Sequence, residues 1–224
     1  MAERRVVFFD VGNTLLFPNR AKMLAPLSKD RHPTLERWQA LECRTKEEFD
    51  HDMQVGGIDH SFWRIFHTHL VEDLEADIVI RDGLVQKLVE NTQKSTNWDQ
   101  ILPGTREALD RIRGDLRIAV ISNADGKIEQ VLSRRGITDC FESITDSGIV
   151  GFEKPRAEIF EAALKAMNAR ADHSLYVGDV YSVDYLGARN AGMQAVLFDV
   201  AGAYRDRELP RVESLEQLET WLRQ

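Results

Sequence analysis

Apolar residues form short runs along the chain, and each run is bounded by polar or turn-forming residues. Runs of this length predict strands that are buried on both faces of a sheet. The clearest ones are Arg5 to Phe9, Leu116 to Ile121, Ser174 to Val177 and Gln194 to Phe198, and a shorter strand is expected at Ser143 to Thr145.

Helical periodicity fills the intervals between most of these runs. We expect helices at residues 127–135, 156–167 and 214–223, with Asp125 as a cap of the first one. Strands that alternate with helices specify right-handed crossovers and a parallel sheet. The predicted fold class is therefore α/β, a Rossmann-like parallel sheet with helices on both faces, and ligands are expected at the carboxyl ends of its strands.

The long interval after the first strand breaks this alternation, because it contains no convincing strand. It is also too long for a structureless loop in a compact domain. A TxxE capping box at Thr45 predicts the start of one helix, and helical spacing predicts two more at residues 61–74 and 80–89. We therefore predict an all-helical cap at residues 17–102, inserted into an α/β core domain of residues 1–16 and 103–224.

Composition narrows the possible partners. The 224 residues include 37 Asp and Glu against 29 Lys and Arg, a net charge of −8, whereas a nucleic-acid surface needs concentrated positive charge. The apolar run at Val6 to Phe9 is far shorter than a signal-peptide core or a membrane span. Cys43 and Cys140 lack metal-site spacing. We expect a cytoplasmic monomer or homodimer that binds neither nucleic acid nor membranes.

Polar residues whose side chains could take part in catalysis or binding follow several of the predicted strands. Each one alone has an ordinary explanation as a helix cap, a turn residue or a solvated charge. The candidates are Asp10 after the first strand, Ser122 and Asn123 after the second, Lys154 before a helix, and Asp179 with Asp184 after the fourth. Because these positions share one edge of the predicted sheet, we expect them to form one site.

Such a site suits magnesium-assisted transfer of a phosphoryl group. Carboxylates that lie close together repel one another unless a cation or a proton holds them, and Mg²⁺ prefers oxygen ligands. Lys154 can offset phosphate charge, and Ser122 can donate a hydrogen bond to a phosphoryl oxygen. Asp10 can attack phosphorus and form an aspartyl phosphate. The expected partner is a small phosphorylated substrate.

At this point the chain resembles the haloacid dehalogenase-like (HAD) hydrolases, in the subgroup with a helical cap after the first strand. Asp10 to Thr14, which read DVGNT, correspond to the family's DxDxT motif, and Ser122 corresponds to its strand-plus-Ser motif. Lys154 in EKPRAEIF matches the family's lysine, and GDVYSVD at residues 178–184 matches its GDxxxxD motif.

The resemblance assigns a role to each matched residue. Asp10, Ser122 and Lys154 would be catalytic, with Asp10 as the nucleophile. Thr14, Asn123 and Lys154 would bind the substrate. The Mg²⁺ ligands would be Asp10, the backbone carbonyl of Gly12, Asp179 and Asp184.

Gly12 is a departure from the family pattern, because phosphatases of the family carry a second Asp there as general acid and base. Its loss removes a role worth about 10² to 10⁴ in rate. Three functions stay open. The first is a Mg²⁺-dependent phosphatase with diminished acid catalysis, or one that acts on acyl phosphates or other substrates whose leaving group needs no proton. The second is a 2-haloacid dehalogenase, whose leaving halide needs no proton, and the third is a low-turnover regulatory protein that binds phosphate and Mg²⁺. A phosphonatase-like hydrolase is a variant that requires a cap lysine, for which Lys22, Lys29 and Lys46 are available.

The cap also concentrates histidines and aromatic residues. Five of the six histidines fall in it, at positions 32, 51, 60, 67 and 69, and one of them could supply the missing acid. We favour surface or interface positions for them, since His67 and His69 lie on different helix faces. Aromatic residues such as Trp38 and Phe66 are expected in the core of the cap or on its face against the sheet domain.

Overall fold

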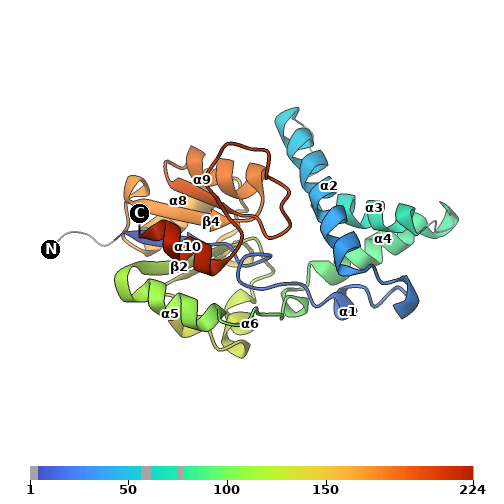
Figure 1. The fold of residues 1–224 in the computed structure, drawn as a ribbon, viewed down its shortest axis with the longest axis horizontal. Helices are drawn as coiled ribbons and strands as arrows, with labels where there is room; N and C mark the ends of the chain where they lie inside the picture. Colours follow the sequence, from blue (N-terminus) through green and yellow to red (C-terminus); the bar gives the residue numbers. More distant parts are fainter. Residues whose placement is uncertain (1–4, 57–61, 75–77, 224) are drawn as a thin grey trace.

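A computed structural model of the protein describes residues 5–56, 62–74 and 78–223. Two sequence-based expectations, His60 and a helix start at Ser61, lie outside these described residues. Figure 1 shows a sheet domain on one side and a group of helices, α2 to α4, on the other.

The sheet contains six parallel strands in the order β3-β2-β1-β4-β5-β6. They are β1 (Val6–Phe9), β2 (Arg117–Ser122), β3 (Ile144–Asp146), β4 (Ser174–Gly178), β5 (Gln194–Phe198) and β6 (Arg211–Val212). The predicted α/β fold class is confirmed, although β6, with only two residues, escaped prediction. Phe9 is level with Val120 of β2 and Val177 of β4, so the carboxyl ends of the three central strands lie at one edge.

Helices cover both faces of the sheet, because alternate residues of each strand point to opposite sides. Val7 and Phe9 pack against α5 (Thr105–Asp115), α6 (Ile128–Arg134) and α10 (Leu215–Leu222). Val6 and Phe8 pack against α8 (Ala157–Ala166) and α9 (Leu186–Asn190). Full burial of each such side chain contributes about 1.5–3 kcal/mol. Shorter helical turns are Thr138–Cys140 (η3), Ser147–Val150 (α7), Ala171–His173 (η4) and the π-helical turn Tyr181–Tyr185 (η5).

All the described helical elements between β1 and α5 form a unit that we call the helical insert. They are α1 (Arg20–Met23), η1 (Lys29–Arg31), α2 (Leu35–Gln54), α3 (Phe62–Asp73), α4 (Ile78–Thr92) and η2 (Ser95–Asn97). The insert has a hydrophobic core of its own, in which the rings of Trp38 and Phe66 lie 4.7 Å apart. Both aromatic residues therefore occupy the core expected for them.

Helix α2 begins ten residues before the predicted start at Thr45, so that prediction is wrong. The side chain of Thr34 accepts a hydrogen bond from the Arg37 amide and caps the helix. The intervening sequence LERWQALECR is rich in strong helix formers, so nothing ends the helix before Thr45. Thr45 is fully buried in the middle of α2.

Asp125 does not cap α6, which corrects a second expectation. Asp146, at the end of β3, accepts hydrogen bonds from the amides of Gly126 and Ile128 and so takes that place. Asp125 instead accepts a 2.5 Å hydrogen bond from the hydroxyl of Ser95. It thereby ties the sheet domain to the segment that returns from the insert.

Two further observations concern the cysteines and the length of the helices. Both cysteines, Cys43 and Cys140, are free thiols. Among the helices of the described residues, none is both long and apolar enough to span a bilayer.

Candidate active site

Three buried carboxylates meet at the carboxyl edge of the sheet. Asp10 follows β1, Asp179 follows β4, and Asp184 lies in the π-helical turn η5. Each offers an oxygen atom within 4.8 Å of the others, and none of the three residues is more than 7% exposed. An all-oxygen donor set of this kind fits Mg²⁺.

Gly178 lets Asp184 approach this edge. A Cβ atom at position 178 would lie only 2.5 Å from the Asp184 carboxyl carbon, so any larger residue would displace that side chain. The Asp184 carboxylate also accepts a 2.9 Å hydrogen bond from the Val180 amide. The glycine and the second aspartate of the GDxxxxD pattern are therefore parts of one packing arrangement.

Lys154 bridges two of the carboxylates. Its ammonium nitrogen lies 2.6 Å from Asp10 Oδ1 and 2.8 Å from Asp184 Oδ1, and its side chain is 3% exposed. The Asn123 side chain holds the Lys154 backbone through two hydrogen bonds, one accepted from its amide at 2.8 Å and one donated to its carbonyl at 3.0 Å. Asn123 therefore positions Lys154.

Tyr176 belongs to the site but was missed by the sequence analysis. Its hydroxyl accepts a 2.7 Å hydrogen bond from Lys154 and lies 3.1 Å from Asp184 Oδ1 and 3.2 Å from the Ile121 carbonyl. The only signal in the sequence is a phenol within the otherwise apolar end of a buried strand. Such a group needs a hydrogen-bonding partner when it is buried.

The charges of the site are incompletely balanced by these contacts. Burial raises the pKa of Asp10 to about 7, although Lys154 lowers it in part and the neighbouring carboxylates add to the rise. Burial likewise raises the pKa of Asp179 to about 6, against the opposing effect of Lys46. The site therefore favours either a bound proton or an added cation.

Lys46 of the helical insert reaches the same cluster. It projects from α2, is 1% exposed, and places its ammonium 3.0 Å from Asp179 and 3.0 Å from Glu42. Asp50, one turn further along α2, accepts a 3.0 Å hydrogen bond from the Ser182 amide of η5. Although burial lowers the pKa of Lys46, the two carboxylates raise it well above its usual range. Lys46 is therefore held as a cation.

The other two candidate lysines lie elsewhere. Lys22 pairs with Asp99 at 2.5 Å, and Lys29 is exposed in η1. A phosphonatase-like reaction needs a neutral amine that can form an imine. Lys46 is the one of the three that reaches the site, but its ammonium form is stabilised there.

The loop that follows β1 shapes the floor of the site. Asn13 adopts a positive φ of 52° and donates a 3.3 Å hydrogen bond to Asp179. The Thr14 hydroxyl is buried and has no hydrogen-bond partner among the residues that the structure describes, so it is available to a ligand or an ion. Ser122 is 4% exposed at the end of β2, next to β1.

Trp98 covers Gly12. A Cβ atom at position 12 would lie 3.2 Å from a carbon of the indole ring. The ring is fixed in turn by a 2.8 Å hydrogen bond from its nitrogen to the Thr92 carbonyl. The space that an acidic side chain would enter at this position is thus occupied by an aromatic ring.

The expected surface or interface role is wrong for His67, and His69 is also buried. His67 is fully buried, its Nε2 lies 2.7 Å from the Thr92 hydroxyl, and burial lowers its pKa to about 3. His69 is 6% exposed and lies 2.9 Å from the carboxylate of Glu48. Both contacts are internal to the helical insert, so neither histidine is placed to replace an acid at position 12.

Comparisons with known proteins agree with the geometry. A family model described as a haloacid dehalogenase-like hydrolase matches residues 4–192. Haloacid dehalogenase-like hydrolase domain-containing protein 3 of Homo sapiens is 31% identical over 209 residues, which cover 86% of this chain and 81% of that protein. The pyrimidine 5'-nucleotidase YjjG of Escherichia coli is 36% identical over 130 residues, 54% of this chain and 56% of that enzyme.

A solved structure has the same fold. The HAD-hydrolase YfnB from Bacillus subtilis, determined with magnesium bound, superposes with a TM-score of 0.70 over 98% of this chain and 99% of its own. At 19% sequence identity this likeness concerns the fold alone.

The raised pKa values predict a stability that depends on pH and on cations. Because the folded pKa values of Asp10 (about 7) and Asp179 (about 6) lie above the usual value, their stabilisation is complete below about pH 4 and is lost as the pH rises through 6 to 7. In EDTA, the Tm should fall by several degrees between pH 5.5 and pH 8, since 1 kcal/mol corresponds to about 2–4 °C at this chain length. Asp10→Asn should reduce that fall, and an equal fall in the variant would contradict this account.

Lys46 should oppose cation binding, because its ammonium forms an ion pair with Asp179, one of the three carboxylates of the cluster. We expect Lys46→Met to bind Mg²⁺ about tenfold more tightly at pH 8, measured by isothermal titration calorimetry. Lys29→Met, which removes an exposed lysine of the insert, is the matched control and should leave the affinity unchanged. Weaker Mg²⁺ binding by Lys46→Met would show that the lysine supports the metal site instead.

Proposed function

Because the chain belongs to the haloacid dehalogenase-like hydrolases, we propose that it is a Mg²⁺-dependent phosphatase of a small phosphorylated metabolite. The observation that carries this proposal is the buried cluster of Asp10, Asp179 and Asp184 with Lys154 in its midst. The relative YjjG bears the name of an enzyme that removes phosphate from a nucleotide. The two free thiols are compatible with work in the cytoplasm.

Asp10 is the proposed nucleophile. One carboxylate oxygen forms a bond to phosphorus while the bond from phosphorus to the ester oxygen breaks, which leaves an aspartyl phosphate and an alkoxide. Water then attacks phosphorus while the bond from phosphorus to Asp10 breaks, which releases phosphate and regenerates the Asp10 carboxylate, and the proton that this water gives up balances the proton that the alkoxide takes up. Asp10 must be ionised to attack, and the ammonium of Lys154 at 2.6 Å favours that ionised form.

Several residues would hold the metal and the phosphoryl group. Asp10, Asp179 and the Gly12 carbonyl are the proposed Mg²⁺ ligands, with Asp184 as a direct or supporting ligand. A bound Mg²⁺ would supply positive charge that stabilises the ionised carboxylates and the phosphoryl oxygens. Ser122 and Thr14 would donate hydrogen bonds to the phosphoryl group, and Asn123 would act by fixing Lys154. Residues 17–102 would serve as the cap that closes over the substrate.

Gly12 favours a second candidate, a 2-haloacid dehalogenase. The position offers no acid, and a halide ion leaves without a proton. In that reaction Asp10 would displace the halide at carbon and form an ester that water hydrolyses. The carboxylate cluster has no evident use there, so we place the phosphatase first. A binding protein with little turnover is the remaining alternative.

Replacement of the nucleophile tests the proposal. Asp10→Asn should lower turnover by roughly three orders of magnitude or more while the circular dichroism spectrum stays unchanged. The assay is a screen of phosphate esters, acyl phosphates and 2-haloacids, with and without Mg²⁺, that measures released phosphate and halide. Mg²⁺-dependent phosphate release supports the phosphatase, and halide release supports the dehalogenase. If neither phosphate nor halide is released, the result supports a binding protein with little turnover.

An acidic side chain can be introduced at position 12 only if the Trp98 ring gives way to it. We expect Gly12→Asp alone to gain little, because its side chain meets the Trp98 ring. Gly12→Asp combined with Trp98→Ala should raise the rate of ester hydrolysis about 10²-fold over Trp98→Ala, the lower end of the range of about 10² to 10⁴ that a general acid contributes. Gly12→Ala with Trp98→Ala is the control. No gain in the Asp double variant would show that the proton comes from elsewhere.

A further inference from the structure

A small cavity lies where the helical insert joins the sheet domain. Two chain segments connect these parts, and they are held side by side by backbone hydrogen bonds between Phe17 and Gln100 at 2.7 and 3.1 Å and from Asn19 to Asn97 at 2.8 Å. Beside them is a cavity of about 190 Å³, which we call the hinge pocket. It is lined by Lys22, Thr96, Asn97, Asp99, Val131, Arg134 and Arg135.

The hinge pocket concentrates positive charge in a chain whose net charge is −8. Three cationic side chains line it, against one carboxylate. They come from both parts of the molecule, since Lys22 belongs to α1 of the insert, whereas Arg134 and Arg135 lie at the end of α6 in the sheet domain. A ligand held by all three would therefore bridge the insert and the sheet domain.

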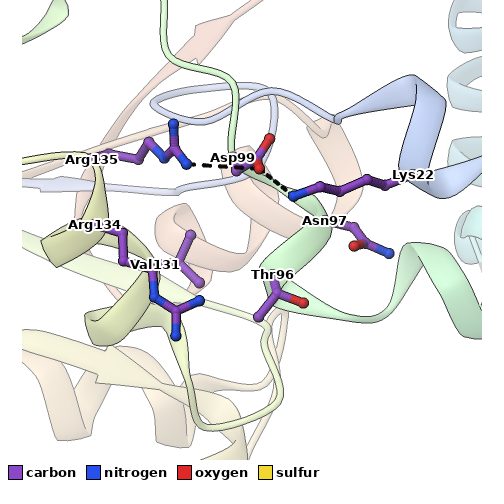
Figure 2. Close-up of a pocket in the computed structure, with 7 residues that line it drawn as sticks. All are labelled: Lys22, Thr96, Asn97, Asp99, Val131, Arg134 and Arg135. Carbon is purple, nitrogen blue, oxygen red and sulfur yellow. Dashed lines mark hydrogen bonds and ion pairs between the residues drawn. The ribbon is translucent and has the colours of Figure 1, made fainter.

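Asp99 shows that the pocket stabilises an anion. Figure 2 shows Lys22 and Arg135 reaching its carboxylate from opposite sides, at 2.5 and 3.8 Å. Burial raises the pKa of Asp99, but the hydrogen bonds from Lys22, Asn19 and Gln100 outweigh it and lower the pKa to about 2.

Positive charge is left over after this pairing. Asp99 can balance only one of the three cations, and the contact with Arg135 is loose at 3.8 Å. Within the part of the chain that the structure describes, the side chain of Arg134, at the end of α6, makes no hydrogen bond or ion pair. A guanidinium group presents a planar set of donors that matches the oxygens of a phosphate.

The size of the cavity limits the ligand. Pockets for drug-sized molecules span roughly 300–1,000 Å³, so this one suits a single tetrahedral anion better than a whole nucleotide. We propose that the hinge pocket binds a phosphate dianion, either inorganic phosphate or the phosphoryl group of a small metabolite, between Lys22, Arg134 and Arg135. This site is separate from the carboxylate cluster and does not depend on the proposed phosphatase activity.

Nuclear magnetic resonance can test the proposal on the full-length chain. Inorganic phosphate is titrated into the ¹⁵N-labelled protein in EDTA at a fixed 0.1 M ionic strength, so that screening is constant. We expect saturable shifts of the Thr96 and Asn97 backbone amides. Shifts confined to the loops that carry Asp10 and Asp179 would overturn the proposal, and so would the absence of any shift.

Matched variants separate a built site from general electrostatics. Arg134→Gln with Arg135→Gln should weaken phosphate binding at least tenfold. Arg156→Gln with Arg170→Gln, which removes two arginines exposed by 59% and 64% elsewhere on the sheet domain, should change it less than twofold. Equal affinity in the two double variants would refute the site.

Two further experiments test whether the insert contributes to binding and which phosphate compound binds. Lys22→Gln should weaken binding at least threefold, and an unchanged affinity would contradict a contribution from the insert. In the Asp10→Asn background, which prevents turnover, glycerol 3-phosphate is compared with inorganic phosphate. Tighter binding of the ester assigns the pocket to metabolites, equal or weaker binding assigns it to the free ion, and no binding of either one overturns the proposal.

Discussion

A buried ammonium between two buried carboxylates is the interaction on which the active site depends. Lys154 holds Asp10 and Asp184 at hydrogen-bond distance in a place from which water is almost excluded. Removal of one partner of such a group leaves an uncompensated charge, which costs about 3–5 kcal/mol. The sheet edge, the Asn123 clamp and the Tyr176 hydroxyl all serve to bring these three side chains together and keep them there.

The fold and the central cluster could be predicted from the sequence because both leave local signals. Each central strand is a short apolar run, and a polar residue comes directly after it, so the geometry of a parallel sheet brings Asp10 and Asp179 together. Lys154 was found through the sequence around it. The start of α2 leaves a misleading signal, because Thr45 is followed by Glu48 in a TxxE pattern whereas the observed cap, Thr34, is followed at that spacing by Arg37.

Other residues of the site leave no such signal, because their roles come from contacts between distant segments. Lys46 meets a carboxylate 133 positions further along the chain, and Trp98 covers a glycine that lies 86 positions before it. In the sequence, Lys46 is one of five lysines in the predicted cap and Trp98 is one of four tryptophans. Only the docking of the helical insert on the sheet domain gives them their surroundings.

The position of Lys46 also links the placement of the insert to the electrical state of the site. Its ammonium is attached to α2, so any movement that withdraws α2 removes one positive charge from Asp179. The coupling is reciprocal: if the docked position of α2 weakens cation binding by a given free energy, then a bound cation weakens the docking of α2 by the same free energy. Lys46 thus acts as a counter-ion that is attached to a helix of the insert, so the cation content of the site and the position of α2 are thermodynamically coupled.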